Sequence, residues 1–263
     1  MIKIILFVFI FIVFFISTVF AQSFKVMTYN IRHGLGIDNV IDTNRIVEVI
    51  KKVNPHFLAL QELDKETTRV ARVNQPAVLA QKLGMHYVFA PAMNFMEGEY
   101  GIAFFSTEPI KSWKTIPLLG ANDEPRVLLI VTTSFKEKTL VFFVSHFTLD
   151  EEVVNKHISL LEEYLSTISN SNQEIIFMGD LNFTPDSPQA NRLRNNFIFP
   201  VSDFPTLLTY PAPNPTMQID FILQKKSPLS HIRLNNIFSI YHPTASDHFP
   251  LIANFEVLNL NIN

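Results

Sequence analysis

The sequence predicts a mixed α/β fold with two β-sheets. Expected strands outnumber expected helices, and both strand–helix–strand units and short hairpin connections occur. A simple doubly wound sheet would alternate strand and helix throughout, so the hairpins indicate that the strands divide between two sheets. We expect residues 22–263 to form one domain, because no linker, repeat or low-complexity tract interrupts them.

The first elements of this domain alternate between strand and helix. Residues 24–31 alternate in polarity and contain Val, Phe and Tyr, which predicts a strand. The run 57–60 is short and wholly apolar, as in a buried strand, and residues 76–83 form a second expected helix closed by Gly84. Between the two strands we expect a helix that Pro55 ends, since apolar residues recur at helical spacing, namely Ile46, Val49, Ile50 and Val53.

A block of strands follows, and then a long helix. The strands are expected near 86–90, 100–106, 110–117, 126–134 and 139–147. The helix is indicated by an apolar stripe with acidic residues before it, which favour a helix N-terminus. The stripe consists of Val154, Ile158, Leu161, Leu165 and Ile168, and the acidic residues are Asp150, Glu151 and Glu152.

The last third returns mainly to strands. Residues 174–178 form a buried strand, and Ser187 followed by Pro188 is typical of a helix start, with the serine as N-cap. The remaining strands are expected near 219–223, 230–239 and 250–257.

Composition excludes several classes of site. The chain has no cysteine, which rules out thiol catalysis, disulfides and cysteine-bound zinc or iron–sulfur clusters. Lysine plus arginine number 21 and aspartate plus glutamate 24, a net charge of -3. This excludes a broadly basic nucleic-acid coat protein, although not an enzyme that acts locally on a phosphate. A metal ion here must bind to carboxylates, amides or imidazoles.

Residues 1–21 have the pattern of a signal peptide. Lys3 precedes an almost wholly apolar run over 4–20, and residues 19–21 form a candidate cleavage site. The alternative is an uncleaved anchor, because about 17 apolar residues can just span a bilayer. We expect the remainder to be exported. It would be secreted or periplasmic after cleavage, with no stable membrane span, and membrane-tethered without cleavage.

Polar residues gather where the expected buried strands end, which is where sites are usually built. Each cluster alone is weak, since Asp and Asn are common in turns. None matches a Walker loop, a nucleophile elbow or a zinc-protease helix. The clusters are Thr28–Arg32, Leu60–Glu62, Ser145–Phe147, Gly179–Asn182, Gln218–Asp220 and Ser246–His248.

Taken together, the clusters indicate metal-assisted chemistry. Four acids lie beside apolar runs, where an unpaired charge is costly, and a divalent cation with imidazoles would offset that cost. Oxygen ligands without thiolates suit Mg²⁺, with Mn²⁺ or Ca²⁺ as alternatives. His146 and His248 could move protons. Such a set permits attack of water on a phosphoryl or acyl centre. The acids are Glu62, Asp180, Asp220 and Asp247.

The order of these motifs resembles the endonuclease/exonuclease/phosphatase superfamily of DNase I-like phosphoesterases. The motifs NIR, QE, SHF, GDLNFTPDS, IDFIL and SDHFP occur in that order over nearly the whole segment after residue 21. The resemblance implies a four-layer α/β/β/α sandwich with its active site at one edge of the two sheets.

The resemblance also implies a role for each residue of the motifs. Glu62 would be the principal metal ligand, with Asn30 and Asp247 close to the ion. Asp180 would position or deprotonate the attacking water, and Asn182 would hold the nucleophile or a phosphoryl oxygen.

The remaining roles concern the phosphate and the leaving group. His248, oriented by Asp220, would hydrogen-bond the scissile phosphate, and His146 would aid protonation of the leaving group. Three residues are expected to contact the substrate, namely Tyr100, Arg126 and Arg32.

The expected function is an exported, divalent-metal-dependent phosphoesterase, and a phosphodiesterase rather than a phosphatase of monoesters. Nucleic acid, phospholipid head groups, sugar phosphates and inositol phosphates remain open as substrates. The absence of long basic runs favours a small phosphoester, a lipid head group or a nucleic acid held at few phosphates. The alternative is a non-catalytic exported binding domain that kept the fold. We expect a monomer.

Overall fold

The structure, a computed structural model, describes residues 22–120, 124–168, 173–200, 207–242 and 244–258. The expected signal peptide, residues 1–21, lies outside the described residues. Within the described ranges, no helix is both long enough and apolar enough to cross a membrane.

The strands form two six-stranded sheets, as the mixture of hairpins and strand–helix–strand units predicted. Sheet 1 has the order β11-β12-β1-β2-β4-β3 and sheet 2 the order β5-β6-β7-β8-β10-β9. Sheet 1 consists of β1 (Gln22–Asn30), β2 (Phe57–Lys65), β3 (His86–Phe95), β4 (Gly98–Ser106), β11 (Ile232–Ser239) and β12 (Leu251–Val257). Sheet 2 consists of β5 (Ser112–Leu118), β6 (Arg126–Phe135), β7 (Lys138–His146), β8 (Glu174–Asp180), β9 (Phe197–Ile198) and β10 (Asp220–Lys225).

The two sheets share one internal plan. In each, the two central strands are parallel and every other neighbouring pair is antiparallel. The parallel pairs are β1–β2 and β7–β8. A helix connects the strands of each pair, α1 (Thr43–Val53) in sheet 1 and α3 (Glu151–Thr167) in sheet 2. The carboxyl ends of parallel strands meet at the same sheet edge, so polar residues there are brought together.

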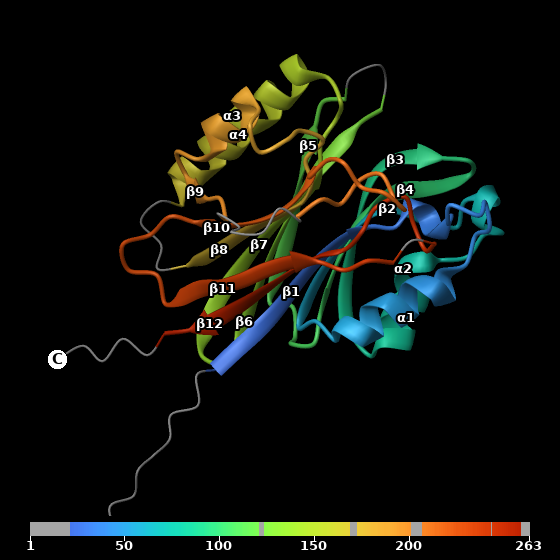
Figure 1. Cartoon of the computed structure of the whole chain (residues 1–263), viewed down its shortest axis with the longest axis horizontal. Coiled ribbons are helices and arrows are strands. Elements are labelled where there is room, and N and C mark those ends of the chain that lie inside the picture. The colour runs from blue at the N-terminus through green and yellow to red at the C-terminus, as the bar shows by residue number, and fades with distance from the viewer. Residues whose placement is uncertain (1–21, 121–123, 169–172, 201–206, 243, 259–263) are drawn as a thin grey trace, which may run out of the picture.

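The helices cover the outer faces of the two sheets, and Figure 1 shows the resulting four layers. Helices α1 and α2 (Gln75–Leu83) pack with the outer side chains of sheet 1. Helices α3 and α4 (Pro188–Leu193) pack with those of sheet 2. Between the sheets lies a third apolar core. This arrangement confirms the predicted α/β/β/α sandwich.

The core between the sheets is rich in phenylalanine. The ring of Phe142, from sheet 2, lies 4.8 Å from the rings of both Phe57 and Phe104, from sheet 1. Large rings that interlock across the interface fix how the sheets stack, since protein interiors tolerate few voids. Packing of these rings therefore fixes the relative position of the two sheet edges, independently of the functional side chains.

The predicted helix starts are observed. The Asp150 side chain accepts hydrogen bonds from the backbone amides of Glu152 and Val153, and the Ser187 side chain accepts from Ala190. Each cap satisfies an amide that would otherwise have no partner in the first turn.

The structure extends two strands by five residues beyond their predicted ends. The strand expected at 57–60 continues to Lys65 as β2, and that expected at 86–90 continues to Phe95 as β3. The two-residue strand β9 was not predicted. The extension of β2 passes through Gln61 and Glu62, where polar residues interrupt the apolar run that defined the prediction.

Candidate active site

A pocket of about 840 Å³ contains most of the predicted site residues. It lies at the edge where the central strands of both sheets end, as the strand-end clusters predicted. Eight of the eleven predicted residues line it, namely Glu62, Tyr100, Arg126, His146, Asp180, Asn182, Asp247 and His248. The other three, Asn30, Asp220 and Arg32, are not part of the lining but contact residues that are.

Glu62 is directed into the pocket by a β-bulge. The pairing of β2 with β4 shifts register between Leu60 and Leu63, so Gln61 and Glu62 together lie opposite the single residue Ile102. Glu62 has φ +58°, a left-handed conformation that non-glycine residues seldom adopt. Such strain is concentrated at functional sites, because the surrounding structure must hold it in place.

Asn30, at the end of β1, links the two sheets through its side-chain amide. Its Nδ2 donates to Glu62 Oε1 at 2.8 Å and to Asp180 Oδ2 at 3.0 Å. Its Oδ1 accepts from the backbone amide of Arg32 at 3.1 Å. The amide nitrogen, which cannot bind a cation, therefore faces Glu62, and the oxygen predicted to lie near the metal faces the backbone.

Gly179 allows β7 and β8 to approach closely just before the site. It has φ +147°, and a Cβ at this position would lie 1.9 Å from the carbonyl oxygen of Ser145. The parallel register then places His146 opposite Asp180. Only glycine fits here, because any side chain would meet backbone that cannot move aside.

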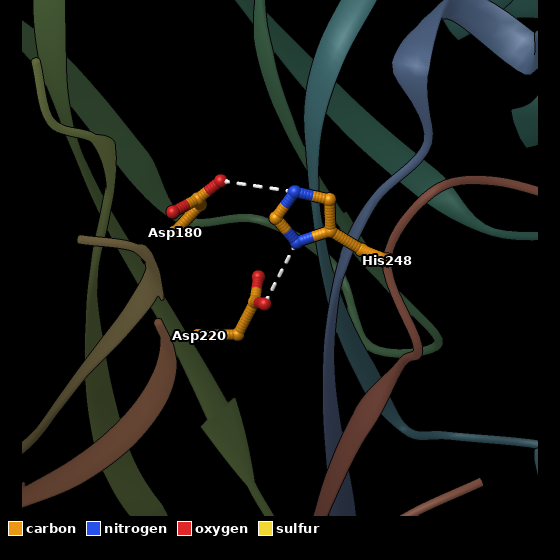
Figure 2. A group of neighbouring side chains, drawn as sticks. All are labelled: Asp180, Asp220 and His248. Carbon is orange, nitrogen blue, oxygen red and sulfur yellow. Dashed lines mark hydrogen bonds and ion pairs between the residues drawn. The ribbon is translucent and has the colours of Figure 1, made fainter. Parts of the chain in front are cut away.

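Asp180, His248 and Asp220 form a buried chain of polar contacts, shown in Figure 2. His248 Nδ1 lies 2.9 Å from Asp220 Oδ2, and His248 Nε2 lies 3.6 Å from Asp180 Oδ2. His146 Nε2 lies 3.6 Å from the same Asp180 oxygen. Two imidazoles therefore converge on one carboxylate, and the second acid fixes the orientation of one of them.

The two histidines have opposite electrostatic environments. Burial disfavours the charged form of His248, but Asp220 and Asp180 outweigh burial and raise its pKa. Burial lowers the pKa of His146 well below its usual range, with Arg126 and His248 adding to the effect. His248 is thus the protonated ring and His146 the neutral one.

The acids of the pocket are poorly solvated and close to one another. Burial raises the pKa of Asp180, and the charge of Asp220 raises it further. Burial likewise raises the pKa of Glu62, partly offset by the hydrogen bond from Asn30. Asp247 also raises the pKa of Glu62. Buried carboxylates that raise each other's pKa values make a site that favours a bound cation.

Asn182 lies in a left-handed turn directly after β8. Its φ is +53°, and its backbone amide donates to Asp180 Oδ1 at 3.1 Å. Its Nδ2 donates to the carbonyl oxygen of Phe147 at 2.9 Å. Asparagine tolerates this conformation better than most residues. The turn that the Gly-Asp-x-Asn pattern predicted is therefore present, with the side chain held at the pocket.

The three predicted substrate contacts differ in position. Arg126 has only 7% of its side chain exposed, and its Nη1 lies 2.5 Å from Glu124 Oε1. Its Nε has no hydrogen-bond partner among the described residues. Tyr100 is buried in the pocket wall. Arg32 lies instead against Asp247, with its Nε 3.5 Å from the Asp247 Oδ2.

Two groups of oxygen and nitrogen atoms could hold a cation. Asp180, Asp220 and His248 offer ligand atoms within 4.8 Å of one another. In that group, however, His248 Nδ1 already contacts Asp220, and protonation of the ring opposes metal binding. Glu62 and Asp247 line the pocket, and neither has a hydrogen bond to the His248 ring among the described residues. The chemistry of this second pair fits Mg²⁺.

Several pocket residues were not predicted from sequence. Arg69 lines the pocket from the 3₁₀ turn at Thr68–Val70, and its guanidinium is paired with Asp64. The ring of Tyr210 lies 4.8 Å from that of His248. Neither residue stands in a motif that would have indicated a site. A further hollow of about 730 Å³ around Tyr87 and Trp113 contains none of the predicted residues.

Comparison with known proteins identifies the family. Residues 27–248 match the model of the Endonuclease/Exonuclease/phosphatase family. No curated protein matches the chain.

Three solved structures illustrate the likeness of fold. A family protein from Bacteroides thetaiotaomicron has a TM-score of 0.73 at 17% identity, over 91% of this chain and 99% of that one. One from Beutenbergia cavernae has a TM-score of 0.70 at 20% identity, over 92% and 73%. A mannosyl-6-phosphatase from Bacteroides thetaiotaomicron has a TM-score of 0.68 at 16% identity, over 88% and 99%. The family match covers every predicted site residue, so the chain belongs to the endonuclease/exonuclease/phosphatase family and is a hydrolase of phosphoester bonds.

Proposed function

We propose that the chain is an exported, Mg²⁺-dependent phosphodiesterase that uses Asp180 to take a proton from water and His248 to stabilise the phosphoryl group. The observation that carries this proposal is the buried chain from Asp220 through His248 to Asp180, which opens onto the pocket beside His146. This arrangement brings together the Asp180 carboxylate as a base, the protonated His248 ring as a hydrogen-bond donor and the neutral His146 ring. These are the groups that in-line hydrolysis of a phosphoester requires.

Asp180 acts on the attacking water in this proposal. Burial and the nearby Asp220 raise its pKa, which strengthens the carboxylate as a base. The oxygen of the water forms the new bond to phosphorus, and the water's proton passes to Asp180. Asn182, held by Phe147 and by Asp180, keeps the water or a phosphoryl oxygen in place.

The two imidazoles act on the phosphate and the leaving oxygen. His248 retains its proton because two acids face it, so its Nε2 donates a hydrogen bond to a phosphoryl oxygen as negative charge develops. Asp220 contacts the other ring nitrogen and sets the orientation. As the bond between phosphorus and the leaving oxygen breaks, the neutral ring of His146 donates a hydrogen bond to that oxygen and stabilises its negative charge.

A divalent cation fits the acids on the sheet 1 side of the pocket. We propose that Glu62 and Asp247 hold it and that Asn30 lies beside it and fixes Glu62 through the observed hydrogen bond. Bound there, the cation would withdraw charge from a phosphoryl oxygen. Mg²⁺ is the first choice, and Mn²⁺ or Ca²⁺ would suit the same oxygen ligands.

The substrate contacts are assigned from their positions. Arg126 presents an unpaired Nε from a buried side chain, which supports a contact with a phosphate oxygen. Tyr100 lies in the same wall and could donate from its hydroxyl. The contact of Arg32 with Asp247 supports a positioning role instead, in which Arg32 holds that carboxylate.

Hydrolysis of chromogenic phosphates tests the proposal. The purified chain should cleave bis(p-nitrophenyl) phosphate faster than p-nitrophenyl phosphate, lose activity in EDTA and regain it with Mg²⁺. A preference for the monoester would favour a phosphatase, the activity by which the mannosyl-6-phosphatase neighbour is named. The same conditions applied to DNA, RNA, sphingomyelin, inositol phosphates and sugar phosphates would identify the substrate class. Failure to cleave any of these would support the non-catalytic binding domain.

Export is proposed from the sequence of residues 1–21. Processing after Ala21 would remove the basic Lys3 and leave Gln22 as the first residue. Intact-mass measurement on protein recovered outside the cytoplasm should give a chain that begins at Gln22. Recovery of the chain from Met1 in membranes would instead support the anchored form.

A further inference from the structure

The pocket combines buried ionisable groups with exposed apolar side chains. His146, Asp180 and His248 are buried. By contrast, 79% of Leu149 and 37% of Met217 is exposed, although both line the pocket. We call four of the apolar lining residues, Met93, Phe95, Leu149 and Met217, the apolar flank. They come from β3, from the β7–α3 connection and from the segment before β10, so three separate parts of the chain supply the same chemistry.

The aromatic part of this flank is held rigid by a buried ion pair. Arg69 Nε and Nη2 lie 2.6 Å and 2.7 Å from the two oxygens of Asp64, whose side chain is fully buried. The Arg69 guanidinium lies 4.6 Å from the ring centre of Phe95 and 5.6 Å from that of Tyr100. Because Asp64 already matches its charge, Arg69 supports the two rings rather than offering a free cation to a ligand.

Polar side chains near the flank are largely bonded to other protein groups. Glu124 accepts from Arg126, and the Thr184 hydroxyl donates to Asp186. A polyol substituent, such as a sugar or glycerol group, would lose hydrogen bonds to water on entering and find few replacements. An apolar substituent would gain from the same desolvation.

We propose that the apolar flank binds an alkyl or aryl substituent of the phosphoester, so that the preferred substrates carry an apolar group rather than a polyol. This inference rests on the proposed function, because it assumes that the phosphate lies among His146, Asp180 and His248. The rigid rings of Phe95 and Tyr100 lower the cost of binding, since fewer side chains must be ordered.

Binding of n-alkylphosphonates in the presence of Mg²⁺ tests the inference without relying on turnover. Complete burial of one methylene strengthens binding about fourfold. In a pocket open to solvent we expect about twofold per methylene, and therefore about 30-fold between methylphosphonate and hexylphosphonate. Propylphosphonate should bind more tightly than 2,3-dihydroxypropylphosphonate, which has the same carbon skeleton. A flat series, no binding of hexylphosphonate, or tighter binding of the dihydroxy compound would overturn the inference.

A matched pair of variants locates the effect. Leu149→Ser should reduce the gain per methylene, because it removes an exposed apolar side chain from the flank. Leu229→Ser, at a site 66% exposed and outside the pocket, should leave the gain unchanged. Equal effects of both substitutions would contradict the proposal. If the unaltered protein hydrolysed no phosphoester, the proposed function would be contradicted. If it hydrolysed phosphoesters but bound the alkylphosphonates equally at every chain length, only the apolar flank would be contradicted.

Discussion

The two sheets share a strand plan but redirect the chain at their functional edges by different means. In sheet 1, the parallel pair β1–β2 ends at Asn30 and Gln61, and the bulge that follows turns Glu62 into the pocket. In sheet 2, the parallel pair β7–β8 ends at His146 and Asp180, and Gly179 lets the two strands approach. One sheet uses an inserted residue with strained backbone, and the other uses the absence of a side chain.

The difference in geometry accompanies a difference in chemistry. Sheet 1 supplies Glu62 beside Asn30, which suit a cation, and sheet 2 supplies His146, Asp180 and Asp220, which suit proton movement. Three contacts join the halves, from Asn30 to Asp180 and from His248, which precedes β12, to both Asp220 and Asp180. Neither sheet holds a complete site, so packing of the sheets is a condition for activity.

The largest expected effect is loss of the groups that act on the attacking water and on the phosphate. Asp180→Asn and His248→Ala should each lower turnover by about 10²-fold or more while the fold persists, since a positioned base and a hydrogen-bond donor to developing charge each contribute that much. Added Mg²⁺ should not restore either variant, because neither change removes a proposed cation ligand. Steady-state kinetics across a Mg²⁺ series provide the measurement. Asp38→Asn, at an exposed aspartate that does not line the pocket, is the matched control for the first variant. Recovery of His248→Ala at high Mg²⁺ would contradict the proposed role of His248 at the phosphate.

The next effect concerns stability and is specific to the close approach in sheet 2. Gly179→Ala should cost about 3 kcal/mol or more, because strained backbone and overpacking each cost about 1–3 kcal/mol. Gly84→Ala is the control, since Gly84 also has positive φ, +66°, but no atom lies within 4 Å of its added Cβ. That variant should lose only about 1–2 kcal/mol. Urea unfolding of both measures the difference, and equal losses would show that the strand contact is unimportant.

A smaller effect is expected from the cation-holding half. Glu62→Gln should raise the Mg²⁺ concentration for half-maximal activity by about tenfold or more, since even partners of metal ligands contribute that much to affinity. A neutral amide is a weaker ligand for a hard cation than a carboxylate. Turnover at saturating Mg²⁺ should largely recover, in contrast to Asp180→Asn. Glu48→Gln, on the exposed face of α1, serves as the control. Unchanged Mg²⁺ demand would remove Glu62 from this role.

The layers and most strands could be predicted because local sequence patterns, namely apolar runs and turn residues, indicate them. The extension of β2 could not, since Gln61 and Glu62 break the apolar pattern and are kept in the strand because the residues on both sides of them pair with β4. Tertiary contacts override local preference at this point. The bulge that directs Glu62 is therefore a product of the fold, although the residue itself could be named from sequence.

The site divides in the same way. Residues in short motifs, such as Asp180 and His248, were predicted, and the structure brings them together. Arg69 and Phe95 were not, because their role depends on a contact between a 3₁₀ turn and β3 that no spacing along the chain records. The orientation of the Asn30 amide is likewise set by partners from both sheets. Sequence identifies the chemical groups, and packing determines which way they face.

The smallest expected effect compares the helical layers that cover the two sheets. His157, on α3 over sheet 2, is buried, whereas the buried residues of α1 over sheet 1 include no titratable group. Its Nε2 lies 2.7 Å from the carbonyl oxygen of Leu119, its ring lies 5.0 Å from that of Phe147, and its Nδ1 has no partner among the described residues. Burial, opposed by the Leu119 bond and reinforced by Arg126, lowers the pKa of His157 below 6.5.

Acidification should therefore loosen α3 before α1. Between the lowered pKa of folded His157 and its ordinary value of 6.5, the unfolded chain binds more protons, so stability falls as pH falls through that window. Amide hydrogen exchange at pH 7 and pH 5, corrected for intrinsic rates, should show a greater loss of protection in α3. His157→Gln stays neutral and can still donate to Leu119, so it should remove the difference, whereas His86→Gln at an exposed site should not. His56, on the sheet 1 side, also has its pKa lowered by burial but is unchanged in both variants, so it cannot produce a difference between them. Equal loss of protection in the two helices, or a persistent difference in His157→Gln, would show that the histidine does not set the acid sensitivity of this layer.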